Sequence, residues 1–378
     1  MVQTTAWVPG TTGPVIGVPA WGGARWGGNG GVDNGRGPYG HTAPPPGVTS
    51  GAALGAAYCG VLPVLAAQGR GYGYLTKVTK AGALVDATGA NSGTVTVNAA
   101  TGTVGVTVTR AGAVLQYLDI VGQLSIRARD VTVRYCRIDG RPVTGTGKYL
   151  VSTQDANPGL VMSYCELLCG QAMSAAFPPY GGYTARYNAV HEVSNDAFKV
   201  GRDALVEYNW VYGLRKAPGA HADPVQWTSG DNIGVLFNRL DCFTGAADAP
   251  SPEVVDFANG TLQVGTMSGN GSWFLMTDNY CNGANYVIRV GNQSPQNGYT
   301  TQHAFWLRNR FGRQFIAGPV YDSIQASADQ VFDDTNVWDQ GGRTYRRTGN
   351  PPVWYYSHIV VAGQPVSDWT PVSMGRYP

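Results

Sequence analysis

The sequence predicts an all-β protein whose short strands stack in a coil, and two observations support this fold class. First, one short unit recurs along the 378-residue chain: an alternating strand, a residue that is mostly Asn or Cys, and a second apolar run, as in residues 131–136 and 204–209. Second, the chain has 53 Gly and 23 Pro but no long amphipathic helix pattern, which is typical of short strands joined by many turns. A strand-turn-strand unit repeated at intervals of roughly 20 to 40 residues indicates a quasi-one-dimensional β architecture.

The residue that follows each first strand marks the repeat. The marked residues are Leu118, Cys136, Cys165, Asn188, Asn209, Asn238, Asn279, Asn309 and Asn336. Because inward side chains of consecutive layers stack in vertical columns, we expect the Asn residues to hydrogen-bond along their own column, as they do in cross-β fibrils. The longest interval, from Asn238 to Asn279, predicts a loop over residues 243–272 that projects from one face.

The regions outside the repeat differ in composition. Residues 94–97 and 103–109 alternate strictly and predict strands. Residues 51–66 predict a short helix or irregular cap, because the open end of a β-coil exposes unpaired backbone groups and needs a cover. The expected segments are a Gly/Pro/Trp-rich N-terminal arm over 1–50, a lead-in and cap over 51–112, the coil over 113–340 and a C-terminal cap or subunit contact over 341–378.

The charge pattern excludes several classes of partner. Only 13% of the residues are charged, the net charge is +2, and no Lys/Arg block marks a nucleic-acid track. No apolar run is long enough to span a bilayer, and the N-terminus lacks the basic and apolar regions of a signal peptide. The six Cys are not spaced in metal-type pairs, so we expect free thiols, no disulfide framework and no metal site.

Three segments carry a resemblance to a known family: residues 47–54, 124–138 and 221–226. Through them the chain resembles the right-handed parallel β-helix proteins of the pectate-lyase-like class, and within it the minor tail or tailspike-like proteins of actinobacteria and their phages. The resemblance covers roughly residues 47–340 and implies a single-stranded right-handed parallel β-helix of about nine rungs, one for each marked residue. It also implies a homotrimer that is assembled in the host cytoplasm, contacts other tail proteins and resides in the virion.

A polar stripe is predicted where the coil aligns residues 196–200 with residues 223–227. The alignment places Asp196 beside Asp223 and Lys199 beside Gln226, with Gln226 pointing outward between inward Val225 and Trp227. The candidate catalytic residues are Asp196, Lys199, His221 and Asp223. The candidate glycan-binding residues are Gln226, Arg215, Lys216, Arg289 and His191. His191, Glu192 and Asp241 lie on neighbouring layers, and their positions fit either an extension of the stripe or a solvated face.

The stripe is open to three interpretations: catalysis by one of two chemistries, glycan contact without turnover, or a purely structural role. Two carboxylates can hydrolyse a glycosidic bond, one as acid and the other as base or nucleophile. Alternatively Lys199, His221 or Arg215 removes a proton next to a uronate carboxyl, with a Ca²⁺ ion held by Asp residues; otherwise no cofactor is expected. The third interpretation is structural, because an Asp at a turn often only accepts hydrogen bonds from backbone amides.

These observations together favour a phage tail protein that binds a host cell-surface glycan through one face of the coil. The first alternative is an enzyme, a polysaccharide lyase or glycoside hydrolase acting on cell-envelope glycan. The second alternative is a structural tail-tip protein without a ligand. Fold alone does not separate them, since the same fold hosts lyases, hydrolases and binding proteins.

Overall fold

A computed structural model gives the structure of the chain. It describes residues 50–217, 220–242, 260–264, 268–284, 286–290, 298–312, 318–322, 330–332, 337–338, 345–348, 353–357 and 369–371. The predicted N-terminal arm lies outside the described residues except for Ser50, as do Asn336 and the centre of the predicted loop, residues 243–259.

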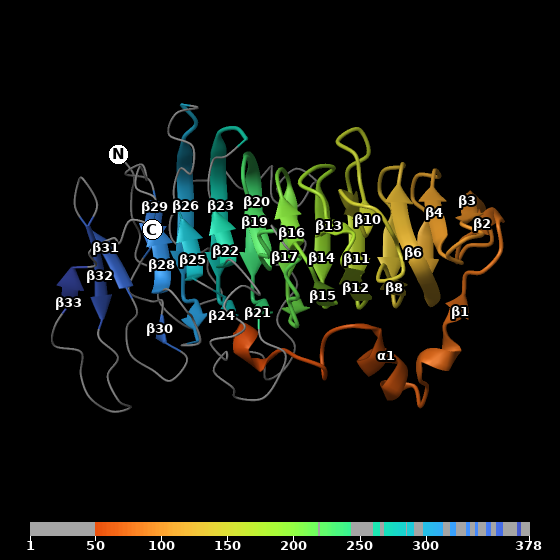
Figure 1. Cartoon of the computed structure of the whole chain (residues 1–378), viewed down its shortest axis with the longest axis horizontal. Coiled ribbons are helices and arrows are strands. Elements are labelled where there is room, and N and C mark those ends of the chain that lie inside the picture. The colour runs from red at the N-terminus through yellow and green to blue at the C-terminus, as the bar shows by residue number, and fades with distance from the viewer. Residues whose placement is uncertain are drawn as a thin grey trace. The chain divides into compact units, whose positions relative to one another are not determined.

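The molecule is all-β, and most of its strands belong to three sheets that are parallel through the repeat (Figure 1). The repeat strands of the 14-stranded sheet are β6 (Leu118–Ile126), β8 (Arg137–Asp139), β12 (Glu166–Gly170), β15 (Ala189–Val193), β18 (Trp210–Val211), β21 (Arg239–Asp241), β24 (Tyr280–Asn282), β27 (Arg310–Phe311) and β30 (Val337–Trp338). The nine-stranded sheet contains β5 (Val114–Gln116), β7 (Thr132–Arg134), β11 (Leu160–Ser163), β14 (Tyr183–Arg186), β17 (Ala204–Glu207), β20 (Gly230–Leu236), β23 (Gly271–Thr277), β26 (Thr301–Leu307) and β29 (Gln330–Phe332). The seven-stranded sheet contains β9 (Lys148–Tyr149), β13 (Met173–Phe177), β16 (Asp196–Val200), β19 (Val225–Trp227), β22 (Gly260–Val264), β25 (Tyr286–Val290) and β28 (Gly318–Asp322).

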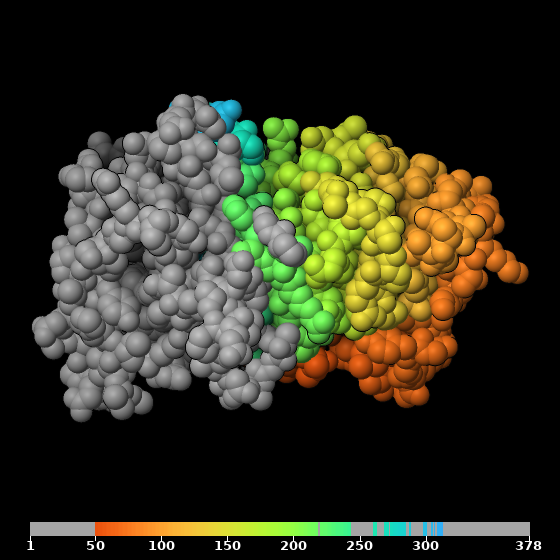
Figure 2. Space-filling model, in the orientation of Figure 1, coloured from red at the N-terminus to blue at the C-terminus, as the bar shows by residue number. Residues whose placement is uncertain are grey.

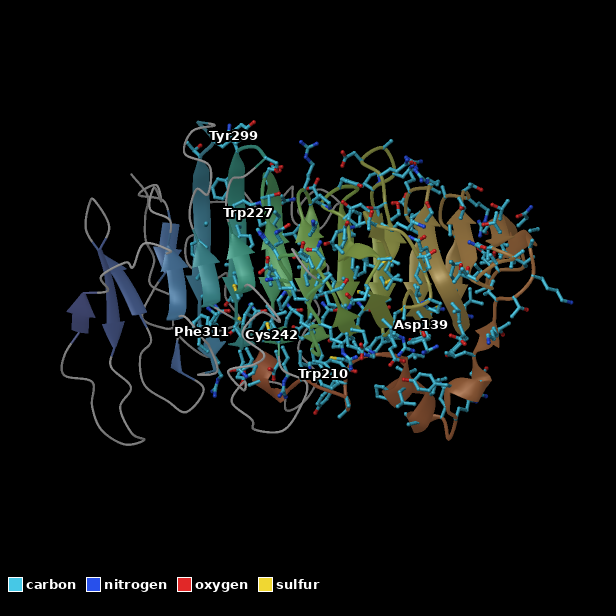
Figure 3. All side chains as sticks on the ribbon, in the orientation of Figure 1. Asp139, Trp210, Trp227, Cys242, Tyr299 and Phe311 are labelled. Atoms are coloured by element: carbon cyan, nitrogen blue, oxygen red, sulfur yellow. The ribbon has the colours of Figure 1, made fainter. Side chains whose placement is uncertain are left out.

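The chain visits the three sheets in a fixed order. It passes through the nine-stranded, the 14-stranded and the seven-stranded sheet, as in β11, β12 and β13, and then begins the next circuit with β14. Each circuit therefore adds one parallel strand to each sheet, and residues of consecutive circuits become neighbours. We call this repeating part the coil. Its interior is a continuous apolar core in which Trp227 and Trp306 are the largest fully buried side chains among the described residues. Figure 3 labels Trp227.

The predicted Asn column is confirmed for the described residues. Asn188, Asn209, Asn238, Asn279 and Asn309 are all fully buried. Asn188 donates from its backbone N and from Nδ2 to Asn209 Oδ1, at 3.0 and 2.9 Å, and the same pair of bonds recurs up the column. Each amide oxygen thus accepts the backbone N–H of the column residue in the preceding layer, and so satisfies a buried donor as the turn requires. Cys165 begins the column by donating its backbone N to Asn188 Oδ1 at 2.9 Å.

The residue before each column position has a left-handed backbone. Its φ lies between 52° and 60° in all eight described layers, at Tyr117, Tyr135, Tyr164, Tyr187, Tyr208, Phe237, Asp278 and Arg308. Such a conformation is unfavourable for bulky residues. Here it projects their side chains outward, where the six rings stack with centroids 4.7 to 5.7 Å apart. Ring stacking between layers offsets part of the backbone cost.

Residues 51–77, which we call the strap, do not cover an end of the coil as expected. They run along its side, past several layers (Figure 1). The strap comprises η2 (Gly51–Ala53), α1 (Val61–Ala67), η3 (Tyr72–Tyr74) and β1 (Thr76–Lys77). Backbone amides of the strap donate to carbonyls of the left-handed corner residues. The bonds run from Gly51 N to Asp278 O at 2.7 Å, from Gly60 N to Tyr187 O at 2.8 Å and from Thr76 N to Tyr117 O at 2.8 Å.

Close packing fixes where the strap lies. At Gly51 a Cβ atom would stand 1.9 Å from the backbone oxygen of Asn238, so only glycine fits there. Gly60 has a φ of 87°, and a Cβ atom there would meet the Cβ of Ala189 at 3.0 Å. Figure 2 shows the orange surface of the strap along the lower edge of the coil.

The remaining expectations outside the repeat are partly confirmed. The lead-in strands exist as β3 (Asn91–Val97) and β4 (Val104–Val108), which with β2 (Gly82–Val85) form an antiparallel extension of the 14-stranded sheet. The predicted loop over 243–272 is wrong in part, because β22 lies inside it. The chain leaves the repeat after β30 and forms an antiparallel sheet of β31 (Tyr345–Thr348), β32 (Val353–Ser357) and β33 (Trp369–Pro371). All six Cys are free and buried, as expected.

Candidate functional site

The predicted stripe lies on the seven-stranded sheet, in the register that the sequence predicts. Strand β16 pairs with β19 so that Lys199 lies opposite Gln226. The same file continues through Gln263 on β22 to Arg289 on β25. The structure therefore brings Lys199, Gln226 and Arg289 into one file, and it inserts Gln263, which the sequence analysis missed.

The two carboxylates of the stripe connect layers of the coil. Asp196 is 1% exposed and Asp223 is 0% exposed. Asp196 Oδ1 accepts the backbone N–H of Asp223 at 3.1 Å, and Asp223 Oδ1 accepts the backbone N–H of Gly260 at 2.7 Å. These are the amide-accepting roles of the structural interpretation. A polysaccharide outside the coil cannot reach either carboxylate unless the layers separate.

The second oxygen of Asp196 faces a cation. Lys199 Nζ lies 3.2 Å from Asp196 Oδ2, with the lysine side chain partly exposed. Burial raises the pKa of Asp196 to about 7, although the charge and hydrogen bond of Lys199 and the Asp223 amide act in the opposite direction. A buried acid that titrates near neutrality is a candidate functional group, but structural ion pairs produce the same perturbation.

The other predicted stripe residues are less closely grouped. Gln226 is only 8% exposed, although it is on the opposite face of β19 from the core residues Val225 and Trp227. His221 is exposed on the segment that precedes β19, two residues before Asp223. Lys216 is half-buried on the segment that follows β18.

His191 and Arg215 do not belong to the stripe. His191 and Glu192 lie on β15 and Asp241 lies on β21, both in the 14-stranded sheet. Arg215 pairs with Glu192 through a 3.0 Å contact between Nε and Oε2. The expected extension of the stripe through His191, Glu192 and Asp241 is therefore wrong, because β15 and β21, which carry these residues, precede the corners that lead to the seven-stranded sheet.

These residues instead border a second cluster, which we call the platform: Trp210, Tyr212 and His191. The Trp210 and Tyr212 rings stack with centroids 3.8 Å apart, and the His191 ring stacks on Tyr212 at 4.7 Å. All three side chains are partly exposed. Trp210 lies on the side of the coil along which the strap runs, as does Asp139 (Figure 3). A stack of partly exposed rings next to charged groups is the kind of surface that binds the apolar face of a sugar.

Carboxylates and cations surround the platform in pairs. His191 Nε2 lies 3.1 Å from Glu166 Oε1, and Arg215 holds Glu192. Burial would raise the pKa of Glu166, but hydrogen bonds from His191 and Tyr72 and the charges of His191 and Arg137 hold it below its usual value. Burial and the nearby Glu166 and Glu192 carboxylates raise the pKa of Tyr212 to about 12. At neutral pH, Glu166 is therefore ionised and the Tyr212 hydroxyl is protonated.

A dense ion-pair network lies beside the platform on the same sheet. Arg137 contacts Asp119 at 3.1 Å, Asp139 at 3.0 Å and Glu166 at 3.7 Å. Arg141 adds two further bonds to Asp139, at 2.8 and 2.9 Å. Each of these carboxylates is paired with a cation, which favours its ionised form. The network can therefore hold hydrogen bonds to a ligand, but it is poorly suited to donate a proton.

The signals for the platform were present in the sequence only in part. Trp210-Val211-Tyr212 directly follows Asn209, so alternation predicts that Trp210 and Tyr212 share the outer face. Tyr72 carried no such signal, because its contact with Glu166 spans 94 residues of sequence, the difference between positions 166 and 72. In the described part of the chain, no group of three or more His, Cys, Asp or Glu side chains is placed to hold a metal ion.

Comparisons with known proteins supply no relative: no family model, no curated protein and no solved structure matches the chain. Within the described residues, the helices are too short or too polar to cross a bilayer.

Proposed function

We propose that this protein binds a cell-surface glycan through the platform, as a tail protein of a phage that infects actinobacteria. We further propose that the coil is a right-handed parallel β-helix of about nine rungs and that it assembles as a homotrimer with other tail proteins in the virion. The role in a phage and the trimer come from the sequence resemblance alone. The glycan-binding role is carried by one observation, the stacked and partly exposed rings of Trp210, Tyr212 and His191.

The polar surroundings of the platform support binding. The Arg215 side chain is 63% exposed, and its Nε lies 3.0 Å from Glu192 Oε2. Sugar hydroxyls and ring oxygens accept hydrogen bonds from the planar guanidinium fork of an arginine, while the sugar's C–H face packs on an aromatic ring. Tyr212, His191 and Arg215 together combine an apolar surface with polar edges, which is how small ligands are usually oriented.

The enzyme alternative is favoured by one observation, the Asp196–Lys199 pair with its pKa near 7. A general acid or base works best when its pKa lies near the operating pH. Against this alternative, Asp196 and Asp223 are buried and each uses one oxygen to hold a neighbouring layer. Binding without turnover therefore fits the positions of the described side chains better than hydrolysis or elimination.

Affinity electrophoresis in gels containing actinobacterial envelope polysaccharide tests the proposal. The wild type is expected to be retarded, and Trp210→Ala is expected to lose about two- to tenfold in affinity, since stacking on one aromatic ring contributes roughly 0.5–1.5 kcal/mol. Tyr149→Ala is the matched control, because Tyr149 also belongs to a partly buried aromatic pair but lies on the seven-stranded sheet.

The same incubation separates the alternatives. New reducing ends would indicate hydrolysis, and absorbance of an unsaturated uronate would indicate elimination. Equal retardation of Trp210→Ala and wild type would remove the platform from the proposal. If the wild type is neither retarded nor active but still enters particles, the protein is a structural tail component.

A further inference from the structure

We infer that the platform is one end of a longer site for an anionic polysaccharide, and that Arg310 recognises a carboxylate or phosphate group of this ligand. The inference deepens the proposed function and rests on it for the presence of a glycan. It adds a charge to the ligand, a direction along the coil, and a second point of contact three layers from Trp210, a distance of about 14 Å.

One file of the 14-stranded sheet leads from the platform to Arg310. Strand pairing aligns four residues of consecutive layers, which are Trp210, Arg239, Tyr280 and Arg310. All four are partly exposed. The residue that follows each of them is buried in the core: Val211, Leu240, Cys281 and Phe311. The file therefore lies on the outside of the coil and alternates between an aromatic ring and a guanidinium group. Figure 3 labels Trp210 and Phe311, near the two ends of the file.

The strap covers this file on one side of Trp210 and leaves it open on the other. The preceding member of the file is Ala189, which is buried, and a Cβ atom at Gly60 of the strap would stand 3.0 Å from its Cβ. On the other side, Arg239 donates from Nη1 to Leu54 O of the strap at 3.1 Å, and its side chain stays 33% exposed. A sugar chain that stacks on Trp210 therefore continues over Arg239.

The spacing of the rings in the file suits an extended chain of sugars. Neighbouring parallel strands are about 4.8 Å apart, so Trp210 and Tyr280, which are two layers apart, are separated by about 10 Å along the coil. Two sugar residues of an extended polysaccharide cover a similar distance, so both rings can pack against one chain. The guanidinium carbon of Arg239 lies 5.5 Å from the centre of the Tyr280 ring, a cation–π contact that helps to hold this ring in place.

The two arginines of the file differ in their partners. Arg239 is compensated by Asp241, because its Nη2 lies 3.3 Å from Asp241 Oδ2. The Arg310 guanidinium makes no hydrogen bond or ion pair with the residues that the structure describes. The nearby corner carboxylate of Asp278 is already paired with Arg308, at 2.6 and 2.9 Å. Arg310 is therefore the uncompensated cation of the file.

An uncompensated arginine beside a carbohydrate-binding ring favours an anionic ligand. The guanidinium group is planar and always charged, and its paired N–H groups match the oxygens of a carboxylate or a phosphate. A neutral glycan that covered Arg310 would remove water from this charge without replacing it, which costs free energy. A uronate or a phosphodiester in the sugar chain would compensate the charge of Arg310. The two groups share this chemistry, and chemical treatment of the polysaccharide distinguishes them.

The test is affinity electrophoresis of the full-length chain in one actinobacterial envelope polysaccharide, prepared in three forms. The first form is untreated. The second is carboxyl-reduced with carbodiimide and borohydride, which converts uronates to neutral sugars. The third is treated with hydrofluoric acid, which removes phosphate. The wild type is expected to bind the untreated form and to lose about three- to tenfold in affinity for one of the two treated forms, the contribution of about one hydrogen bond.

The decisive variant is Arg310→Gln, which removes the charge and keeps a polar side chain. It is expected to lose about three- to tenfold in affinity for the untreated form and to bind the form that lacks the anionic group as well as the wild type does. Arg310→Lys keeps the charge and is expected to retain most of the affinity. Lys148→Gln is the matched control, because Lys148 is also a partly exposed cation but lies on β9 of the seven-stranded sheet. It is expected to bind all forms like the wild type.

The outcomes separate the inference from the proposed function. If Trp210→Ala weakens binding but Arg310→Gln does not, the inference is overturned and the platform keeps its role. Equal binding of the wild type to all three forms also overturns the inference, since the ligand is then recognised without its charge. An equal loss of affinity of Arg310→Gln for every form would assign Arg310 to the fold of β27. If the wild type is retarded by none of the forms, the proposed function fails and the inference fails with it.

Discussion

The seven-stranded and 14-stranded sheets both carry polar side chains on the outside of the coil, but they use them differently. On the seven-stranded sheet, Asp196 and Asp223 are buried and accept backbone amides of the next layer. On the 14-stranded sheet, Glu166 and Glu192 pair with His191 and Arg215 around partly exposed rings. Residue type alone does not distinguish them, since both groups contain carboxylates next to cations. What differs is whether a carboxylate must satisfy backbone groups that the coil leaves unpaired.

The largest expected effect comes from breaking this structural role. Asp223→Ala leaves the buried Gly260 amide without its acceptor, and we expect unfolding free energy to fall by about 2 kcal/mol. Guanidinium denaturation measures this loss, with Asp130→Ala as a control at an exposed aspartate. Retardation in polysaccharide should stay at the wild-type level. Loss of retardation at unchanged stability would return Asp223 to the list of ligand-binding residues.

The next effect is a pH dependence of stability that comes from Asp196. Burial raises the pKa of Asp196 from 3.8 to about 7, so the folded state holds a proton that the unfolded state releases between these values. Stability from this group is complete below pH 4 and declines as the pH rises toward 7. Asp196→Asn keeps the acceptor for the Asp223 amide and lacks the titration. Wild-type stability relative to Asp196→Asn should therefore fall between pH 4 and pH 7; a rise across this range would mean that Lys199 keeps Asp196 ionised throughout.

The smallest effect on stability belongs to the platform. Arg215→Gln removes an exposed ion pair with Glu192, which contributes less than about 0.5 kcal/mol. Affinity for polysaccharide should nevertheless decrease, by about three- to tenfold if the guanidinium donates to the sugar. Arg129→Gln, at a similarly exposed arginine beside Asp130, is the control for nonspecific charge effects. If Arg215→Gln lost as much stability as Asp223→Ala, the exposed polar groups of the 14-stranded sheet would be as important for the fold as the buried carboxylates of the seven-stranded sheet.

Much of the coil could be predicted because its rules are local and repeated. The Asn column follows from one residue per repeat, and Asn188, Asn209 and Asn238 bond as expected. The alignment of Lys199 with Gln226 follows from the same register. The strap could not be predicted, since it docks on corner carbonyls such as Tyr187 O through backbone amides, which leave no residue-specific pattern.

The candidate site was predicted less well, for a reason visible in single residues. Alternation indicates which side of a strand a residue occupies, but not how deeply its surroundings bury it. Gln226 is on the expected face and yet is almost fully buried. His191 was placed near the stripe because it lies on a neighbouring layer, but it belongs to β15 of the 14-stranded sheet, where the left-handed backbone of Glu192, with a φ of 56°, comes near the end of the strand.

Hydroxyl-radical footprinting with and without envelope polysaccharide tests the contrast between the two sheets most directly. Binding through the 14-stranded sheet should protect Trp210 and Tyr212 and leave His221 and Lys199, at the stripe, as reactive as in the free protein. Protection of His221 and Lys199 with unprotected Trp210 and Tyr212 would contradict the assignment of the ligand to the platform.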